Sequence, residues 1–389
     1  MSKKRKVLFV HDGPLYQGDD GIYRGVHYND EIKNRYLQLG DHVTFLMRLK
    51  KVSSNEVQNF SLISPEKFEF IKVPNFKKVT SYFKINKAKN IIEKAVKEHD
   101  ILVARMPSAT GAIAVKFATK LKIPYVIEFV ACTFDAYWNY GWKGKLIAHL
   151  KMWEQQMILK NAPYVIYVTK KFLQSRYPTK GKSINCSNVQ IDKINEKDLN
   201  KRLRKIKSSE APLILSTVAS LDTIYKGQDS VLKAIGNLKK EGYFFYYKMV
   251  GQGSSDRLKK IAAEYGVENQ IEFVGPLKHE KVLDFFEEID VYIQPSKQEG
   301  LPRALIESMS KACPALGSKR AGIPELLSEE NLFSPGDFIE IALKLKNINK
   351  AWMVKEAEKN WKISKEYNND ILENRRKDFF ETFLNENFS

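Results

Sequence analysis

Short apolar runs alternate with longer stretches of helical periodicity along the whole chain. The runs are Val7–Val10, Val43–Met47, Ile101–Ala104, Tyr125–Phe129 and Tyr164–Val168 in the first half, and Leu213–Ala219, Tyr246–Val250, Ile271–Val274, Val291–Gln294 and Cys313–Leu316 in the second. Continuous apolar runs separated by helices are typical of parallel strands that are buried on both faces. The pattern predicts an α/β protein with two doubly wound domains and a ligand cleft at the carboxyl ends of the strands.

A charged stretch separates the two series of strands. Residues 192–210 read DKINEKDLNKRLRKIKSSE, and we interpret them as a linker plus an exposed helix. The expected domains are therefore 1–191 and 211–370. After Asn331 the pattern is helical to the end, so residues 371–389 are predicted as a C-terminal helix that can pack back on the first domain.

The net charge of +18 is distributed unevenly. Residues 1–190 hold 32 lysines and arginines against 15 acidic residues, whereas the remaining residues hold 32 against 31. Such one-sided basicity fits nucleic acid, an anionic membrane surface or an anionic substrate. The chain contains no helix-turn-helix, zinc-finger or RNA-binding sheet signature, so we expect no nucleic-acid partner.

Neither a membrane span nor a secretion signal is visible. Every apolar run is broken by charge well before the ~18–20 residues that span a bilayer, and the basic start MSKKRKVLFVHDG leads directly into a strand. The cysteines Cys132, Cys186 and Cys313 are few and widely spaced, which supports neither a disulfide framework nor a zinc site. We therefore expect a cytoplasmic chain without a bound metal.

A lysine-rich helix is predicted within residues 76–100. Seven lysines lie between Lys77 and Lys97, while Ile85, Ile92 and neighbouring apolar residues follow helical spacing on another face. A polybasic helix gains on the order of 1 kcal/mol per lysine close to an anionic bilayer. This helix predicts peripheral attachment to the inner face of a membrane; the alternative is a merely soluble lysine-rich helix.

The stretch QEGLPRALIESM, residues 298–309, places Glu299 and Glu307 on either side of a turn that opens a helix. Pro302 suits the start of a helix over 303–311, and Gly300 permits a close backbone approach to a ligand. A helix N-terminus attracts phosphate, and carboxylates are strong acceptors for sugar hydroxyl groups. Considered singly, Glu299 is better interpreted as a surface turn residue and Glu307 as an ordinary helix glutamate.

The surroundings of this stretch change that balance. Pro-Ser precedes it, Gly-Ile-Pro-Glu (322–325) follows it, and three further segments come before it in order: LSTVASLDTIYKGQDSVLKAI (215–235), YKMVGQGSSDRL (247–258) and IEFVGPLKHEKVLDFFEEIDVYIQPS (271–296). Together they closely resemble glycosyltransferase family 4, whose members are retaining enzymes of the GT-B fold. The resemblance implies two Rossmann-like domains that face each other across a cleft.

The resemblance also implies roles for individual residues. Glu299 and Lys226 are the expected catalytic pair, with Glu299 on hydroxyls of the transferred sugar and Lys226 on the diphosphate. Glu307 is expected on the ribose hydroxyls of the nucleotide. The wider expected donor site is made up of Glu307, Gly300, Leu301, Ser220, Gly13, Gly275 and Arg303.

One departure from the family pattern concerns the phosphates. The family often has Gly-Arg where this chain has Ala219-Ser220, so Ser220 offers only a hydroxyl in place of a guanidinium. Arg303 is a candidate to compensate, with a solvent-facing orientation as its alternative.

The first half contributes candidates for the acceptor. The segment HDGPLYQGDDGIYRG (11–25) is predicted as a loop; Gly13 is expected to contact the donor through its backbone, and His11 either binds the acceptor or belongs to a solvated loop. Asp135 and Trp138 lie in an aromatic cluster after a strand. Aromatic faces pack on sugar C–H surfaces, although ordinary core packing explains them as well.

The reaction that follows is transfer of a sugar from a nucleotide diphosphate-sugar to a saccharide or polyprenyl-linked acceptor, with retention, in bacterial surface-polysaccharide assembly. A uridine donor is expected only from its frequency in the family. No cofactor or metal is expected, because GT-B enzymes generally use protein cations and helix ends instead. The alternatives are a GT-B sugar-nucleotide epimerase and a non-catalytic nucleotide-sugar or membrane-binding module.

Overall fold

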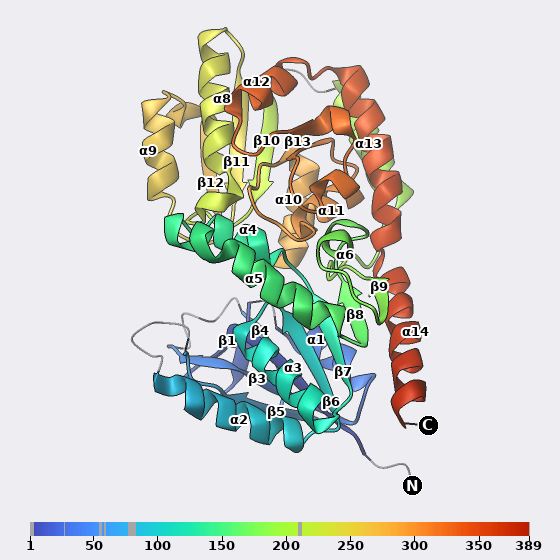
Figure 1. The fold of residues 1–389 in the computed structure, drawn as a ribbon. Helices are drawn as coiled ribbons and strands as arrows, with labels where there is room; N and C mark the ends of the chain where they lie inside the picture. The colour runs from blue at the N-terminus through green and yellow to red at the C-terminus, as the bar shows by residue number, and fades with distance from the viewer. Residues whose placement is uncertain are drawn as a thin grey trace.

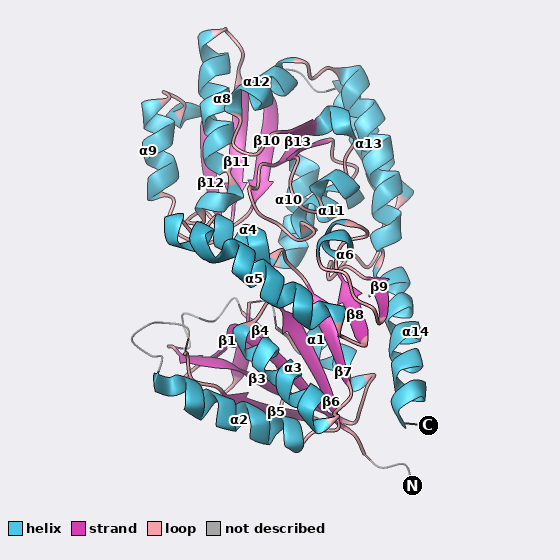
Figure 2. Ribbon diagram, viewed as in Figure 1, coloured by secondary structure: helices cyan, strands magenta, loops and turns pink. Residues whose placement is uncertain are grey.

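Two sheets, one in each half of the chain, form the framework of the molecule (Figure 1). The computed structural model describes residues 4–26, 28–53, 57, 60–76, 83–208 and 212–388. Within them the first sheet has nine strands and the second has six. Helices cover the faces of both sheets (Figure 2), as the expected doubly wound arrangement requires.

The first sheet is parallel except at one corner. Its parallel strands follow the order β5-β3-β1-β6-β7-β8-β9, while β2 and β4 extend β1 in antiparallel fashion. The strands are β1 (Lys6–Gln17), β2 (Tyr23–Gly25), β3 (His42–Lys51), β4 (Ser61–Leu62), β5 (Phe68–Lys72), β6 (Ile101–Met106), β7 (Tyr125–Phe129), β8 (Tyr164–Tyr167) and β9 (Lys182–Asn185). Every residue of β6 and β7 is buried, which is why apolar residues dominate these strands. Their two charged residues, Arg105 and Glu128, form an ion pair with each other at 2.9 Å.

The second sheet is parallel throughout, in the order β12-β11-β10-β13-β14-β15. The strands are β10 (Leu213–Val218), β11 (Phe245–Val250), β12 (Ile271–Gly275), β13 (Val291–Gln294), β14 (Ala315–Ser318) and β15 (Leu332–Phe333). The chain winds outward from β10 to β11 and β12, and then returns to continue from β13 in the other direction. The connections therefore leave the sheet on opposite sides at β10 and β13, and this switch point is where open parallel sheets place their ligands.

The helices connect these strands and pack on their faces. They are α1 (Asp30–Leu37), α2 (Ile85–Lys97), α3 (Ala109–Leu121), α4 (Thr133–Trp138), α5 (Trp142–Lys160), α6 (Phe172–Arg176), α7 (Glu196–Ser208), α8 (Gln228–Lys240), α9 (Asp256–Glu264), α10 (His279–Glu288), α11 (Arg303–Ser310), α12 (Phe338–Lys346), α13 (Lys350–Ser364) and α14 (Asn369–Phe388). Among the described residues, no helix is long and apolar enough to cross a membrane.

The ten predicted strands all form, with shifts of a few residues at their ends. One prediction was wrong for most of its length: the loop expected over residues 11–25 is confined to residues 18–22, because β1 continues through Gln17 after an irregularity between Val10 and Pro14 and β2 begins at Tyr23. The second half of β1 pairs with both β3 and β2, so the backbone groups of this Gly- and Pro-containing segment are satisfied by neighbouring strands. Short strands at the ends of the two sheets, such as β9 and β15, were missed.

The charged stretch between the domains is less exposed than predicted. It forms α7, whose Arg202 and Ile206 are buried. The Arg202 guanidinium donates to the carbonyl oxygens of Phe286 and Ile289, 2.5 Å away in each case. Since these carbonyls lie at the C-terminal end of α10 and just beyond it, the positive charge of Arg202 complements the helix end and anchors α7 to the second domain.

The last two helices run along one side of the molecule from the second sheet to the first (Figure 1). At the end of this path, Phe379 and Phe383 of α14 contact the ring of Tyr164 on β8. Glu386 forms an ion pair with Lys182 of β9. The chain terminus thus belongs to the packing of the first domain.

Candidate functional site

An ion pair spans the switch point of the second sheet. Lys226 Nζ lies 2.6 Å from Oε1 of Glu299, although the two residues are 73 positions apart. Lys226 ends a short 3-10 helix (Ile224–Lys226) in the segment after β10, and Glu299 lies in the segment after β13. The two residues expected to act together are therefore brought together by the order of the strands.

The backbone beside Lys226 explains why a glycine follows it. Gly227 has a φ of +78°, a conformation that favours glycine, and a Cβ there would lie 2.1 Å from the carbonyl oxygen of Pro295. The close approach is reinforced by the Lys297 N–H, which donates to the carbonyl oxygen of Tyr225 over 2.7 Å. The Lys-Gly turn thus packs directly on the Pro-Ser turn, and this contact positions the ion pair.

The Glu299 carboxylate is held by more than the lysine. Its Oε1 also accepts from Ser296 Oγ at 2.8 Å and from Gln294 Nε2 at 3.2 Å. The side chains of Lys226 and Glu299 remain 23% and 12% exposed. A partly accessible pair of opposite charges, held in one geometry by neutral donors, can exchange its mutual contact for contacts with a charged or hydroxyl-bearing ligand.

Glu307 lies one turn into α11 and is buried. Burial raises the pKa of its carboxyl group, while the positive charges of Arg303 and His279 act in the opposite direction. Nδ1 of His279 on α10 is 4.0 Å from Oε1 of Glu307. Arg303 is exposed at the first position of α11, consistent with the solvent-facing alternative for its orientation. A hydroxyl group that donates a hydrogen bond to a buried carboxylate of this kind lowers its free energy.

Gly300 makes its close approach to the other domain rather than to an open space. A Cβ at this position would lie 2.1 Å from the carbonyl oxygen of Val130, which follows β7. The carbonyl oxygen of Gly300 accepts from the N–H of Gly322 at 2.9 Å, and Leu301 is buried beside it. The backbone of the first domain therefore requires a glycine at position 300, and the expected contact of Gly300 with a ligand stays a prediction.

Ser220 lies in the turn after β10, and its hydroxyl group donates to the carboxylate of Asp222. The hydroxyl of Thr223 donates to Ser220 Oγ over 3.0 Å. Where the family often places a cation, this chain therefore has a serine bonded to an acid. The sequence raised no expectation for Asp222, and its position two residues after the altered Ala-Ser pair was the available signal.

Glycines line the neighbouring strand ends for steric reasons. A Cβ on Gly251 would lie 2.0 Å from the carbonyl oxygen of Ala219, and one on Gly253 would lie 2.6 Å from the carboxylate of Asp222. Gly275 has a φ of +83° with open space around it, and its carbonyl oxygen accepts from Gly251 N–H at 3.0 Å. The Gly-x-Gly turn thus packs tightly against the turn after β10, whereas Gly275 is favoured by its backbone conformation and is joined to this turn by a hydrogen bond.

The first-domain candidates near β1 are held within the protein. Nδ1 of His11 accepts from the N–H of Gly13 at 2.8 Å and lies 2.5 Å from the hydroxyl oxygen of Tyr28. A Cβ on Gly13 would meet both of these groups at 2.9 Å. Since Nδ1 accepts a hydrogen bond, neutral His11 carries its ring proton on Nε2.

Asp12, one of the acids in this segment, is a buried capping residue and not part of a solvated loop. Its carboxylate accepts from the N–H groups of Ala109 and Thr110 at 2.7 and 3.0 Å, and from Thr110 Oγ1 at 2.6 Å. The acid thereby satisfies the first amides of α3 and occupies the positive end of that helix.

Asp135 on α4 is 2% exposed and lies between arginines of the two domains. Its Oδ1 is 3.3 Å from Nη1 of Arg176 and 3.9 Å from Nη1 of Arg320. Its Oδ2 has no hydrogen-bond partner within the part of the chain that the structure describes. Trp138, on the same helix, stacks on Phe134 with ring centroids 5.2 Å apart and is 38% exposed. The two predicted acceptor residues thus lie at the boundary between the domains.

A second contact across this boundary involves Glu325 of the Gly-Ile-Pro-Glu segment, to which the sequence assigned no role. Its carboxylate accepts from the N–H groups of Lys170, Lys171 and Phe172 at 2.6, 3.0 and 2.6 Å. An acid of the second domain therefore caps the N-terminus of α6 in the first domain. Beside it is a cavity of about 380 Å³, lined by Lys171, Phe172, Ser175, Lys319, Arg320, Ala321, Pro324 and Glu325.

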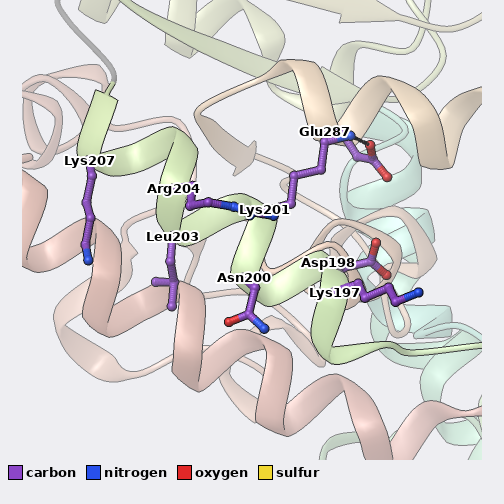
Figure 3. A pocket seen from close by; sticks show the side chains of 8 residues that line it. All are labelled: Lys197, Asp198, Asn200, Lys201, Leu203, Arg204, Lys207 and Glu287. Carbon is purple, nitrogen blue, oxygen red and sulfur yellow. Dashed lines mark hydrogen bonds and ion pairs between the residues drawn. The ribbon is translucent and has the colours of Figure 1, made fainter.

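A larger cavity of about 620 Å³ lies away from all these residues, along α7 and next to Glu287 of α10 (Figure 3). Its acids are already paired: Glu287 with Lys201 and Lys311, and Asp198 with Lys311. None of the predicted site residues lines it. Among the described residues, no group of three or more His, Cys, Asp or Glu side chains could hold a metal ion.

Three comparisons place this geometry among known proteins. The family model described as glycosyl transferases group 1 matches residues 200–366. Protein CapJ of Staphylococcus aureus is 33% identical over 95% of this chain and 90% of its own length. The putative colanic acid biosynthesis glycosyltransferase WcaL of Escherichia coli is 31% identical over 33% of each chain.

Solved structures support the fold. HepE of Anabaena, in complex with UDP-glucose, superposes with a TM-score of 0.65 at 14% identity, covering 97% of this chain and all of the other. At that identity the likeness concerns the fold alone. The two parallel sheets and their helices have the GT-B arrangement.

Proposed function

The chain belongs to the group 1 glycosyl transferases, and from that premise we propose that it is a retaining hexosyltransferase of family 4. It transfers a sugar from a nucleotide diphosphate-sugar, for which we propose UDP as the nucleotide, to a saccharide or polyprenyl-linked acceptor. The names of WcaL and its relatives, which refer to colanic acid and amylovoran biosynthesis, support a place in bacterial surface-polysaccharide assembly. We place the reaction in the cytoplasm, at the inner face of the membrane.

The observation that carries the proposal is the Lys226–Glu299 ion pair at the switch point of the second sheet. Parallel sheets bind ligands at this crevice because the loops separate there and expose strand ends and helix N-termini. In the proposed complex, Lys226 leaves Glu299 for the diphosphate, and Glu299 accepts from hydroxyls of the transferred sugar. The proposal is supported by UDP-glucose in the complex of HepE, a protein of the same fold.

The other donor contacts come from residues around this pair. Glu307 accepts from the ribose hydroxyls, which relieves the cost of its burial. Amides at Gly300 and Leu301, together with the N-terminus of α11, face the phosphates. Among the described residues, the N-cap Pro302 makes no side-chain cap hydrogen bond at that helix end. We assign weaker parts to Arg303 and Ser220, and backbone contacts to Gly13 and Gly275.

The chemistry required of the protein is electrostatic. As the sugar–phosphate bond breaks, negative charge develops on the leaving diphosphate, and Lys226 with the α11 N-terminus stabilises it. The acceptor oxygen attacks from the same face, and a leaving-phosphate oxygen takes its proton. Asp135, Trp138 and His11 are the candidate acceptor contacts, and the protein's own cations perform the task for which other enzymes use a metal.

The proposal is tested by measuring nucleoside diphosphate release from a panel of UDP-hexoses. The purified full-length chain is incubated with each donor, with and without short-chain polyprenyl diphosphate saccharides or free saccharides. UDP release that requires an acceptor, and a product whose anomeric configuration matches the donor, support the proposal. A sugar epimerised without acceptor would favour the epimerase, and calorimetric binding without turnover on any acceptor would favour the binding module.

A pair of lysine variants tests whether the activity depends on Lys226. Lys226→Ala should abolish acceptor-dependent UDP release, whereas Lys260→Ala, which removes an exposed lysine of α9, should leave it unchanged.

A further inference from the structure

A stripe of large apolar side chains lies exposed along α5. Its members are Trp142, Leu146, Leu150, Trp153 and Met157, which are 69%, 74%, 52%, 57% and 41% exposed. Their spacing of four, four, three and four residues places them on one face of the helix. At ~1.5 Å per residue the α5 stripe is roughly 22 Å long. Single exposed apolar residues scattered over a surface are normal, whereas a contiguous exposed apolar patch of this kind marks a contact surface.

The α5 stripe is not the inward face of the helix. α5 packs on the protein through a different face, which includes the buried residues Gly144, Ala148 and Leu159. A Cβ at Gly144 would lie 2.1 Å from the carbonyl oxygen of Tyr137, so the helix approaches α4 closely by using small residues. The core contact is therefore complete without the stripe, whose side chains point away from it.

Cations border the α5 stripe. The helix carries Lys143, Lys145, Lys151 and Lys160 against a single acid, Glu154. Glu154 is already paired with Lys151 at 2.8 Å. Two of these lysines lie over tryptophan rings: Lys143 Nζ over Trp142 of the stripe and Lys145 Nζ over Trp138 of α4, each 5.5 Å from the ring centroid. Tryptophan and leucine flanked by lysine is the pattern of helices that lie in the interface of a bilayer.

We propose that the α5 stripe inserts into the interface of an anionic lipid bilayer; the inference rests on the membrane-linked acceptor of the proposed function. An isologous contact with a second copy would bring the same face of both chains together, and its bordering lysines would repel each other. Anionic headgroups, in contrast, neutralise these lysines while the apolar side chains enter the acyl boundary. The excess positive charge of residues 1–190 acts in the same direction.

The position of α5 connects this surface to the site. Asn139, at the end of α4 and three residues before α5, donates from Nδ2 to the carbonyl oxygen of Lys297 over 3.2 Å. Lys297 is two residues before Glu299. The docking helix thus begins next to the proposed reaction site, so that a bilayer held by the α5 stripe presents lipid-linked acceptors beside the cleft.

This assignment differs from the one expected for the lysine-rich helix. Of that segment, residues 77–82, including Lys77 and Lys78, lie outside the described residues. Within α2, Lys94 and Lys97 form exposed pairs with Glu98 and Glu93. The remaining lysines of α2 supply long-range attraction, whereas the α5 stripe supplies the apolar surface that α2 lacks.

The proposal is tested by co-sedimentation of the full chain with vesicles of phosphatidylglycerol and phosphatidylcholine, and with vesicles of phosphatidylcholine alone. We expect partition into the anionic vesicles that partly survives high salt, and a blue shift of tryptophan fluorescence. The variant Leu146→Ser/Leu150→Ser/Trp153→Ser should lower the partition coefficient by about tenfold or more. The matched control is Ile339→Ser/Leu343→Ser on α12, which removes side chains 60% and 57% exposed and should bind like the wild type.

Each other outcome overturns the proposal. Sedimentation that is equal in the wild type and the stripe variant, or that disappears completely with salt, would assign attachment to lysines alone. Stripe-dependent dimers in sedimentation velocity without vesicle binding would identify a second copy as the occupant. UDP-sugar binding by calorimetry, measured on the same variants, keeps the two proposals apart, because its failure affects the proposed function and leaves vesicle binding intact.

Discussion

The Lys226–Glu299 ion pair predicts that loss of the Glu299 charge has opposite effects on UDP affinity and on turnover. The Glu299 carboxylate lies 2.6 Å from Lys226 Nζ, and in the proposed complex it competes with the diphosphate for this lysine. The variant Glu299→Gln keeps the shape of the side chain but removes its charge. We therefore expect this variant to bind UDP more tightly than the wild type, and to turn over UDP-sugar more slowly.

The magnitude follows from the geometry of the pair. A hydrogen bond between charged groups contributes ~1.5–3 kcal/mol net, and the 12–23% exposure of these side chains places this pair toward the lower end of that range. A competing contact of about 1–2 kcal/mol corresponds to roughly 5–30-fold in Kd. Glu299→Gln also removes a negative charge that would repel the phosphates, and this change likewise increases the affinity for UDP.

The assay is isothermal titration calorimetry with UDP and with UDP-sugar, together with acceptor-dependent UDP release. Lys226→Ala is the companion variant, because it should weaken both ligands by about 10–100-fold. If Glu299→Gln binds UDP as weakly as or more weakly than the wild type while remaining folded by circular dichroism, Lys226 does not move from Glu299 to the diphosphate, and the reasoning fails.

Four further predictions concern Glu307, Glu325 and Gly300. Glu307→Ala should weaken UDP binding by about 10–100-fold while Glu264→Ala on α9 does not; wild-type affinity in calorimetry would remove Glu307 from the site. Burial raises the folded-state pKa of Glu307, so its protonation favours the folded state. This contribution to stability is lost as pH rises from the pKa of a glutamate in the unfolded chain through the raised pKa of the folded chain. Thermal denaturation should show this loss of stability with rising pH in the wild type but not in Glu307→Gln. Glu325→Ala removes the acceptor of the first amides of α6. Hydrogen exchange of these amides should accelerate by about tenfold, which corresponds to the ~1–2 kcal/mol of a lost cap. Unchanged protection would show that the cross-domain cap contributes nothing to stability. Gly300→Ala places a Cβ 2.1 Å from the carbonyl oxygen of Val130. The variant should separate the domains, measured as a larger radius of gyration in small-angle scattering, and should lower turnover more than UDP affinity. A loss confined to UDP affinity would contradict the proposed domain contact.

The strands were predictable because of how they are buried. β6, β7 and β13 are buried at every position, so apolar residues dominate each of them in the sequence, interrupted only by Arg105, Glu128 and Gln294. The second half of β1 was missed, because Gly13 and Pro14 are typical of turns and only pairing with β2 and β3 keeps the segment extended. The two-residue strand β15 is too short to show any period.

The surface helix α5 shows a second limit of pattern reading. Its apolar residues lie on two faces, one packed through Gly144 and Ala148 and one exposed through the α5 stripe. A sequence pattern gives the apolar positions of a helix but not which of two apolar faces meets the core. Burial in the folded chain makes that choice.

The local pieces of the site were determined by the sequence: a Lys-Gly turn, Glu299 before a helix start, and Glu307 one turn inside that helix. Turn and helix-start residues indicated these local structures, whereas the roles of Lys226, Glu299 and Glu307 were implied by the resemblance to glycosyltransferase family 4. Which groups meet was decided by the tertiary structure alone. Lys226 pairs with Glu299, Glu325 caps a helix of the other domain, and Gly300 adjoins Val130 because strand order and domain packing bring distant segments together. Contacts between segments far apart in the chain depend on the whole fold, and no local spacing encodes them.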